Sequence, residues 1–141
     1  MQNIERFEKF VISQKGLLIR DDKALIMEMG KYPGHWDFPG GRVDVGEDAR
    51  QAFDREIAEE LGIENFKDLG VIHYHAWYLP SGQGVCGVAN LIKNKEDDII
   101  LSKEHLQLTW ISEGEIDNYK YIWPEMNIMI KKGFAKYKLL K

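Results

Sequence analysis

The sequence predicts a single α/β (α+β) domain over residues 1–141, in which β-strands flank a central helix and a second helix closes the chain. Three observations lead to this prediction. Residues 48–61 contain no Gly or Pro and are rich in Ala, Glu, Arg and Gln, which favours a helix. Segments typical of strands lie before and after this helix and are separated by turn-forming residues. A length of 141 residues suits one domain.

Before the helix we expect two strands, at residues 7–20 and 23–29, joined by a turn at Asp21-Asp22. The segment GKYPGHWDFPGG, residues 30–41, follows them and is expected to be a loop that leads into the helix. The chain therefore reaches the helix after one hairpin and one Gly- and Pro-containing connection.

The central helix has clear start and stop signals. Glu47 and Asp48 place negative charge at its amino end, where the helix dipole favours it, and Gly62 follows as a stop. Apolar residues recur every four positions along it and form a stripe that we expect to be buried. The stripe consists of Ala49, Phe53, Ile57 and Leu61, and is widened by Ala52.

After the helix, strands are expected at residues 68–79 and 85–92, around a turn at residues 81–84, and again at residues 106–111. Pro124 then stands at the start of a final amphipathic helix, because Pro is well tolerated in a first helical turn. The apolar residues that mark this helix are Ile128, Ile130, Phe134 and Tyr137.

Composition excludes several classes of protein. Apolar residues make up 44% and charged residues 30%, which indicates a globular rather than a disordered chain. The net charge is −4 and no basic surface is evident, which argues against duplex nucleic acid as a partner. No run approaches the about 18 apolar residues of a membrane helix. The charged first ten residues and the single Cys86, which allows no internal disulfide, favour the cytoplasm. A monomer and a homodimer both remain open.

Residues 41–63, GRVDVGEDARQAFDREIAEELGI, carry seven acidic and three basic residues and so account for the whole net charge. Glu56, Glu59 and Glu60 stand at positions i, i+3 and i+4, which brings three carboxylates to one helix face. Like charges repel there, and a hard divalent cation with oxygen ligands would reverse the sign of that interaction. An acidic stretch is more often a solvated face. Gly41, Glu47, Arg55 and Gly62 stand at defined positions around the carboxylates, which a plain solvated face does not require.

This stretch resembles the Nudix box, G-x5-E-x7-R-E-U-x-E-E-x-G-U with U an aliphatic residue, and every specified position is filled. The resemblance implies an α/β/α sandwich with a mixed β-sheet. It also implies an enzyme that hydrolyses a diphosphate linked to another moiety, with Mg²⁺ or Mn²⁺ bridging phosphate oxygens and activating a water. The metal ligands that it implies are the carbonyl of Gly40 and the carboxylates of Glu47, Glu56, Glu59 and Glu60.

Catalytic roles follow from the same resemblance. Arg55 is expected to orient the carboxylates, while Glu47 serves either as an outer metal ligand or as the partner of Arg55. Glu59, Glu60 or Glu104 is expected to take the proton from water, and the resemblance does not assign one of them. Glu104 precedes a Trp-containing strand, as an additional acid does in family members. Rival acids in the same region are Glu96, Asp97 and Asp98.

Candidate substrate-binding residues lie on both sides of the box. Trp36 opens the segment WDFPGG, which resembles the entry to the box in many Nudix proteins, and Arg42 lies just inside it. The stretch Trp123-Pro124-Glu125 resembles one in nucleotide-sanitising enzymes, where Trp stacks on an oxidised purine and an acid reads its edge. Met126 stands where those enzymes have a second acid. The alternative is a core Trp followed by a helix start.

Two histidines alternate with Trp77 along the expected strand at residues 68–79. His73 and His75 therefore share one face and could form part of a metal site. No nearby Cys or third ligand is evident, so we expect a half-buried sheet face.

The predicted substrate is a nucleoside triphosphate, ordinary or oxidised, cleaved to the monophosphate and pyrophosphate. ADP-ribose, nucleotide sugars and dinucleoside polyphosphates are the alternatives within the family. A non-catalytic, nucleotide-sensing Nudix domain is an alternative of another class. The chain keeps Glu56, Glu59 and Glu60, which such sensors typically lose, so we expect an enzyme.

Overall fold

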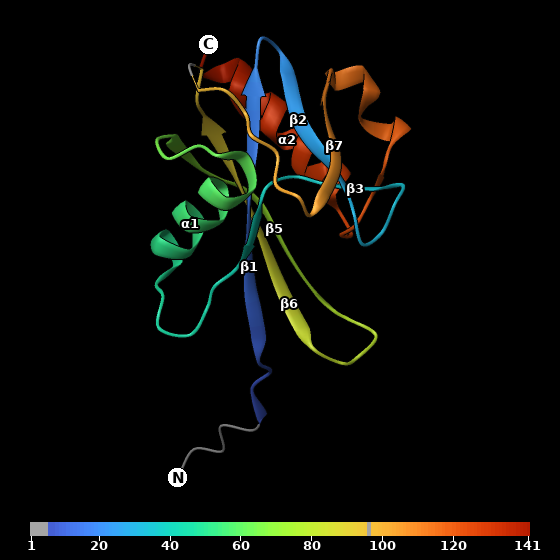
Figure 1. The fold of residues 1–141 in the computed structure, drawn as a ribbon. Helices are drawn as coiled ribbons and strands as arrows, with labels where there is room; N and C mark the ends of the chain where they lie inside the picture. The colour runs from blue at the N-terminus through green and yellow to red at the C-terminus, as the bar shows by residue number, and fades with distance from the viewer. Residues whose placement is uncertain (1–5, 96) are drawn as a thin grey trace.

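One mixed β-sheet is the framework of the computed structural model, which describes residues 6–95 and 97–141 (Figure 1). Two α-helices pack on this sheet, α1 (Ala49–Leu61) and α2 (Met126–Leu139), and a 3-10 helix, η2 (Glu113–Asn118), precedes the last strand. The strands are β1 (Phe10–Arg20), β2 (Lys23–Met29), β3 (His35–Asp37), β4 (Gly40–Arg42), β5 (Lys67–Tyr78), β6 (Gly84–Lys93), β7 (His105–Ile111) and β8 (Lys120–Tyr121).

The described residues form an eight-stranded sheet whose main path runs β5-β6-β1-β2-β3-β8. Strand β4 adds to β1, and β7 adds to β2. The pairs β1–β6 and β3–β8 are parallel and the other pairs are antiparallel, which confirms the mixed sheet. Strand β1 thus pairs with β2, β4 and β6 and ties the two halves of the sheet together.

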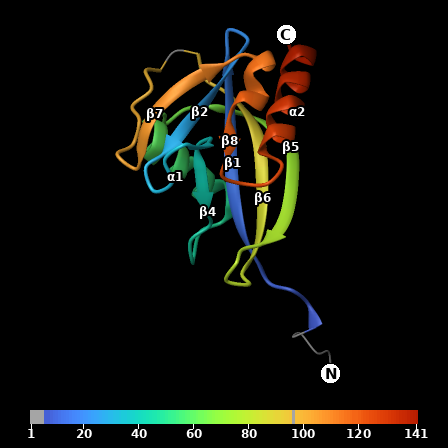
Figure 2. The same ribbon diagram turned by 90° about the vertical axis from the view of Figure 1, so that its right-hand side faces the viewer.

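The central strand β1 is buried on both faces. Leu17 and Ile19 point into one core with α2, whereas Leu18 points into a second core with α1. Alternation along a strand sends successive side chains to opposite faces, so the two helices cover opposite sides of the sheet (Figures 1 and 2). The expected α/β/α sandwich is therefore confirmed.

Helix α1 begins and ends where the sequence predicts. Asp48 caps it by accepting a hydrogen bond from the backbone N–H of Gln51, whose side chain accepts one in return from the Asp48 N–H. Gly62 ends it in the left-handed conformation, with φ of 70°. Ala49 is exposed, so its assignment to the buried stripe was wrong, because the core under α1 begins only at Ala52 and Phe53.

Differences between prediction and structure concern short elements and element ends. The expected loop at residues 30–41 contains β3 and β4, and β8 and η2 were not predicted. Strands of two or three residues show no hydrophobic period, and these form by pairing with longer neighbours. Strand β1 begins at Phe10 rather than residue 7. In α2, Ile128 is 37% exposed and lies off the buried face. No helix of the described residues is long and apolar enough to span a membrane.

The packing of α2 on the sheet predicts the effect of a glycine substitution. A Cβ at Gly133 would lie 2.3 Å from Cδ2 of the fully buried Leu17. Gly→Ala within a helix ordinarily stabilises by up to about 1 kcal/mol, but here overpacking should lower the free energy of unfolding by about 1–3 kcal/mol. Urea denaturation of Gly133→Ala measures this. Gly114→Ala is the control, since its Cβ meets nothing within 4 Å. A Gly133→Ala protein as stable as the parent would contradict the tight approach.

Candidate active site

The site is built where β1, β4 and α1 meet. Lys15 pairs with Gly40 across the antiparallel β1–β4 ladder, and the Gly40 N–H donates a 2.9 Å hydrogen bond to Oε2 of Glu60 on α1. Gly40 has φ of 147°, and a Cβ there would lie 1.8 Å from the Gln14 carbonyl oxygen. A Cβ at Gly41 would lie 2.4 Å from Cδ of Glu56. Only glycine lets this backbone lie against the two carboxylates.

The three box carboxylates differ in exposure. Glu60 is buried, Glu56 is half-buried and the Glu59 side chain is 58% exposed. Burial raises the pKa of Glu60 to about 8, although the charge of Lys15 and the Gly40 N–H oppose the rise. Burial likewise raises the pKa of Glu56, against hydrogen bonds and charge from Arg55. Ionisation of Glu56 and Glu60, the two less exposed carboxylates of this face, therefore lowers the stability of the folded protein.

Arg55 links the carboxylates to the start of α1. Its Nε and Nη2 bind both oxygens of Glu47 at 2.7 and 2.8 Å, and its Nη1 donates to Glu56 at 2.9 Å and to Glu59 at 3.3 Å. Hydrogen bonds from Arg55 hold the pKa of Glu47 down at about 2, and Glu47 and Glu56 raise the pKa of Arg55. Glu47 was expected to be either an outer metal ligand or the partner of Arg55. In this structure it has the geometry of the Arg55 partner.

The oxygen ligands implied for a metal fit a hard divalent cation. Gly40 offers a carbonyl, Glu56, Glu59 and Glu60 lie along the facing turns of α1, and Gly41 leaves the space that a side chain would fill. Glu56 and Glu59 both accept from Nη1 of Arg55, whereas Glu60 accepts from the Gly40 N–H. Accordingly, no three His, Cys, Asp or Glu side chains of residues 6–95 and 97–141 converge as a ready metal cluster. Holding a cation requires Glu59 to turn inward, and the ligand roles stay predictions.

A buried lysine that sequence reasoning missed lies beside these ligands. Lys15 is 6% exposed, and its Nζ is 2.9 Å from Oδ2 of the buried Asp37 and 3.5 Å from the Gly40 carbonyl oxygen. Burial alone lowers the pKa of Lys15, but the charges of Asp37, Glu60 and Glu56 together raise it. The signal in the sequence was a lone charge in the interior of the strand segment FVISQKGLLIR.

A cavity of about 540 Å³ opens next to Lys15 and Glu60. Glu104 and His105 line the same cavity as Glu60. Burial lowers the pKa of His105. Among the rival acids, Asp97 accepts a hydrogen bond from Asn94, and Glu96 lies outside the described residues. The structure thus brings Glu104 to the site, and its catalytic role stays a prediction.

Trp123 lies next to Lys15. Its ring is 5.0 Å from the Lys15 Nζ and packs at 60° against Trp77, with ring centroids 5.2 Å apart. It is half-buried at the edge of the α2-side core. Lys15 therefore contacts the aromatic ring as well as Asp37 and the Gly40 carbonyl.

Glu125 adopts the left-handed conformation at the start of α2, with φ of 65°. Its carboxylate meets Nε2 of His73 at 2.8 Å and Nδ1 of His75 at 2.9 Å. The hydrogen bond to His73 and the nearby histidines lower the pKa of Glu125. The predicted H-x-H face is thus a half-buried sheet face that holds an acid. Met126, at the second-acid position, is fully buried.

The side chains of the remaining two candidates make no hydrogen bond to Glu56, Glu59 or Glu60 in the described residues. Trp36 packs edge-on against Tyr119, with ring centroids 5.1 Å apart, beside the α2-side core. Arg42 is exposed on β4, and its carbonyl accepts a hydrogen bond from Arg55. Substrate contacts by Trp36 and Arg42 stay predictions.

The chain is similar to known proteins over most of its length. A family model described as NUDIX domain matches residues 13–133. The chain is similar to a CTP pyrophosphohydrolase of Escherichia coli strain K12, with 31% identity over 117 residues, covering 73% of this chain and 76% of that protein. It is also similar to a bis(5'-nucleosyl)-tetraphosphatase (asymmetrical) of Caenorhabditis elegans, with 34% identity over 134 residues, covering 89% and 96%.

A solved structure, a C. elegans Ap4A hydrolase binary complex, matches with a TM-score of 0.74 and 27% identity, over 93% of this chain and 99% of that one. The range matched by the family model includes Lys15, Gly40, all three box glutamates and Trp123. The fold and the carboxylate site therefore fall within the same shared region.

The buried carboxylate predicts how stability depends on pH without divalent cations. The pKa of Glu60 is raised from 4.5 to about 8 in the folded protein, so its contribution is full below about pH 4.5 and is lost as the pH rises through about 8. In EDTA, we expect the free energy of unfolding to fall by a few kcal/mol between these pH values, measured by urea denaturation. Glu60→Gln should remove most of this slope, and an unchanged slope in that variant would contradict the assignment.

Proposed function

The chain belongs to the NUDIX domain family and is a pyrophosphohydrolase-type enzyme, and we propose that it cleaves nucleoside triphosphates, ordinary or oxidised, to monophosphates and pyrophosphate. One observation carries the proposal. Lys15, a buried cation, contacts both the ring of Trp123 and the Gly40 carbonyl, and it lines one cavity together with Glu60. A triphosphate with a stacked base needs an aromatic ring, a cation and metal-binding oxygens near one another.

In this proposal the phosphates lie on the carboxylate side, and the base lies against Trp123. Stacking on an aromatic ring contributes about 1–3 kcal/mol per base and tolerates any base. Lys15 Nζ lines the cavity and donates to a phosphate oxygen between the two ends, since charge-assisted hydrogen bonds to phosphate are strong. Lys15 thus fixes the distance between base and phosphates.

On the carboxylate side, Arg55 positions Glu56 and Glu59, and the Gly40 N–H positions Glu60. Mg²⁺ or Mn²⁺, when bound, supplies positive charge to the phosphate oxygens and acidifies a water. Glu59, Glu60 or Glu104 accepts the proton of the attacking water. Glu104 does so from the lining of the cavity, whereas Glu59 and Glu60 do so from α1.

A second candidate substrate, a dinucleoside tetraphosphate, is favoured by the C. elegans relative, which matches over more of this chain than the CTP pyrophosphohydrolase does. Tyr78, at the end of β5, is 56% exposed and donates a hydrogen bond to Glu8. In this second candidate we propose that its ring stacks on the second base. ADP-ribose, nucleotide sugars and a sensing role without catalysis have no such supporting observation here.

The proposal predicts that one substitution abolishes turnover and leaves the fold intact. Glu59→Gln keeps shape and hydrogen bonding at an exposed position but removes a charge from the site, so kcat should fall at least about 100-fold. Phosphate release with added pyrophosphatase and Mg²⁺ measures this on ordinary and oxidised nucleoside triphosphates, dinucleoside tetraphosphates, ADP-ribose and nucleotide sugars. Glu64→Gln, an exposed acid just past the box, is the matched control and should keep full activity.

This panel of substrates distinguishes the candidate functions from one another. Preference for a triphosphate supports the main proposal, and cleavage of dinucleoside tetraphosphates alone would replace it with the second candidate. Equal activity in Glu59→Gln and the parent would exclude the carboxylate face as the catalytic site. Nucleotide binding without turnover across the panel would favour a sensor.

A paired substitution tests whether Lys15 contacts the substrate or only neutralises the charge of the Asp37 carboxylate. Lys15→Met alone leaves a buried carboxylate unpaired and should destabilise by about 3–5 kcal/mol. The double variant Lys15→Met, Asp37→Asn removes both charges and should fold. If Lys15 binds phosphate, kcat/KM of the folded double variant should still be about 10–100-fold lower, mainly through KM. A double variant with the kinetic constants of the parent would limit the pair to a structural role.

A further inference from the structure

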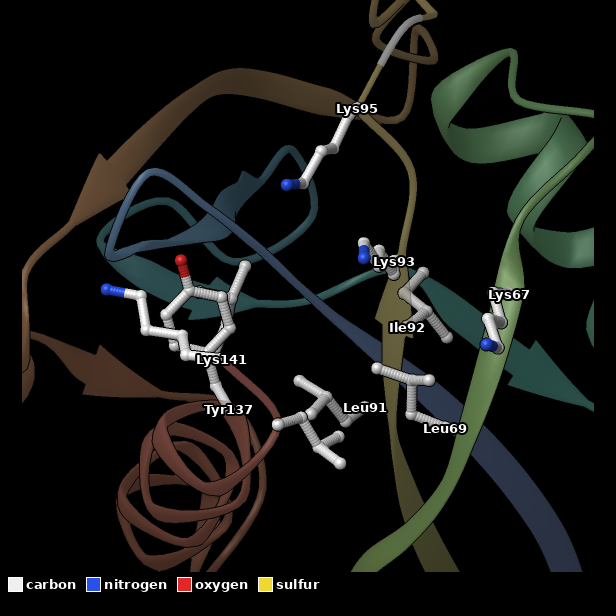
Figure 3. Close-up of a pocket in the computed structure, with 10 residues that line it drawn as sticks. Lys67, Leu69, Leu91, Ile92, Lys93, Lys95, Tyr137 and Lys141 are labelled. Atoms are coloured by element: carbon white, nitrogen blue, oxygen red, sulfur yellow. The ribbon is translucent and has the colours of Figure 1, made fainter.

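A second cavity, of about 380 Å³, lies where the carboxyl end of α2 meets β1, β5 and β6 (Figure 3). No residue that lines it belongs to the carboxylate face or to the cavity next to Lys15. Its volume lies within the range of about 300–1,000 Å³ usual for small-molecule sites. It is therefore large enough to be considered separately from the proposed active site.

The floor of this second cavity is apolar. Leu69 of β5 and Leu91 and Ile92 of β6 gather at its centre, and Tyr137 of α2 stands at one side (Figure 3). Leu91 and Ile92 belong to the two cores and are held rigidly, whereas Leu140 at the end of α2 is 56% exposed. An apolar group entering the cavity would meet a preformed surface.

Lysines surround that floor. Lys67 and Lys93 are directly opposite each other in the antiparallel β5–β6 ladder, where like charges destabilise the pair. Within residues 6–95 and 97–141, neither ammonium has a carboxylate within 4.0 Å. Lys95 and Lys141 line the same cavity, and Lys141 pairs with Asp22. The rim thus carries positive charge, and no acid of the described residues pairs with the two lysines of the cross-strand pair.

We propose that this cavity binds a free anion with a single apolar tail, such as an alkyl phosphate or carboxylate. The anionic head lies between Lys67 and Lys93 and relieves their repulsion, and the tail covers Leu69 and Leu91. The apolar floor and the charged rim each select one half of such a molecule. The proposal concerns a site other than the active site and does not depend on the substrate of the enzyme.

Isothermal titration of the full chain with octyl phosphate tests this, in EDTA so that the carboxylate face takes up no phosphate through a divalent cation. We expect one molecule bound per chain, and at least tenfold weaker binding of inorganic phosphate, which lacks the tail, and of octanol, which lacks the charge. Lys67→Gln, Lys93→Gln should weaken octyl phosphate binding at least tenfold. Leu140→Ser, at an exposed floor position, should weaken it as well.

The matched control is Lys9→Gln, Lys120→Gln, which removes the same charge from exposed positions outside the cavity and should bind like the parent. Equal weakening in both double variants would indicate non-specific attraction and overturn the proposal, as would the absence of saturable binding. A third result would also overturn the proposal: the protein does not bind octyl phosphate but sediments with phosphatidylglycerol vesicles, and the Lys67→Gln, Lys93→Gln variant does not sediment. That result would indicate that the two lysines bind a membrane surface.

Discussion

The approach of the Gly40-Gly41 backbone to α1 is the contact on which the site depends. It joins three elements, since the Gly16 N–H donates to the Pro39 carbonyl at 2.7 Å, Lys15 pairs with Gly40, and the Gly40 N–H donates to Glu60. A Cβ at either glycine would collide with backbone or with a box carboxylate. The Gly40 backbone and the Glu60 carboxylate are therefore held in place by a strand pairing and a helix before any ligand binds, whereas the exposed Glu59 is not.

This close approach concentrates charge in a poorly solvated place. Lys15, Asp37 and Glu60 are all buried, and buried charges destabilise unless they are paired and hydrogen-bonded. Lys15 and Arg55 supply positive charge from two sides, yet the pKa values of Glu56 and Glu60 remain raised. The cations of the protein are thus insufficient to balance the acids. That excess of negative charge costs stability, and it is the feature that would attract the divalent cation of the proposed mechanism.

Sequence reasoning succeeded where the determinants are local. The ends of α1 follow from Asp48, Gln51 and Gly62, all within or next to the helix, and the three box glutamates share a face because of helical spacing alone. It failed where partners are distant in the chain. Strands β3, β4 and β8 exist only through pairing, and Lys15 meets Asp37 across 22 positions. The partners of Glu125 could not be predicted either, because His73 lies 52 positions away.

The partners of Glu125 bear on which nucleobase the proposed site prefers. The Lys132 ammonium, which can only donate, lies 3.0 Å from Nδ1 of His73, and Nε2 of the same ring lies 2.8 Å from the Glu125 carboxylate, so Nε2 is the ring nitrogen that donates to Glu125. Glu125 is therefore held ionised, as a pure acceptor. Met126 is fully buried and offers no second acid. A base edge that reaches Glu125 must then present N–H donors. Cytosine, adenine and guanine present an amino group there, whereas the N3–H of uracil and thymine lies between two carbonyl oxygens, which an ionised carboxylate repels. Among triphosphates stacked on Trp123, this arrangement favours amino-bearing bases over uracil and thymine.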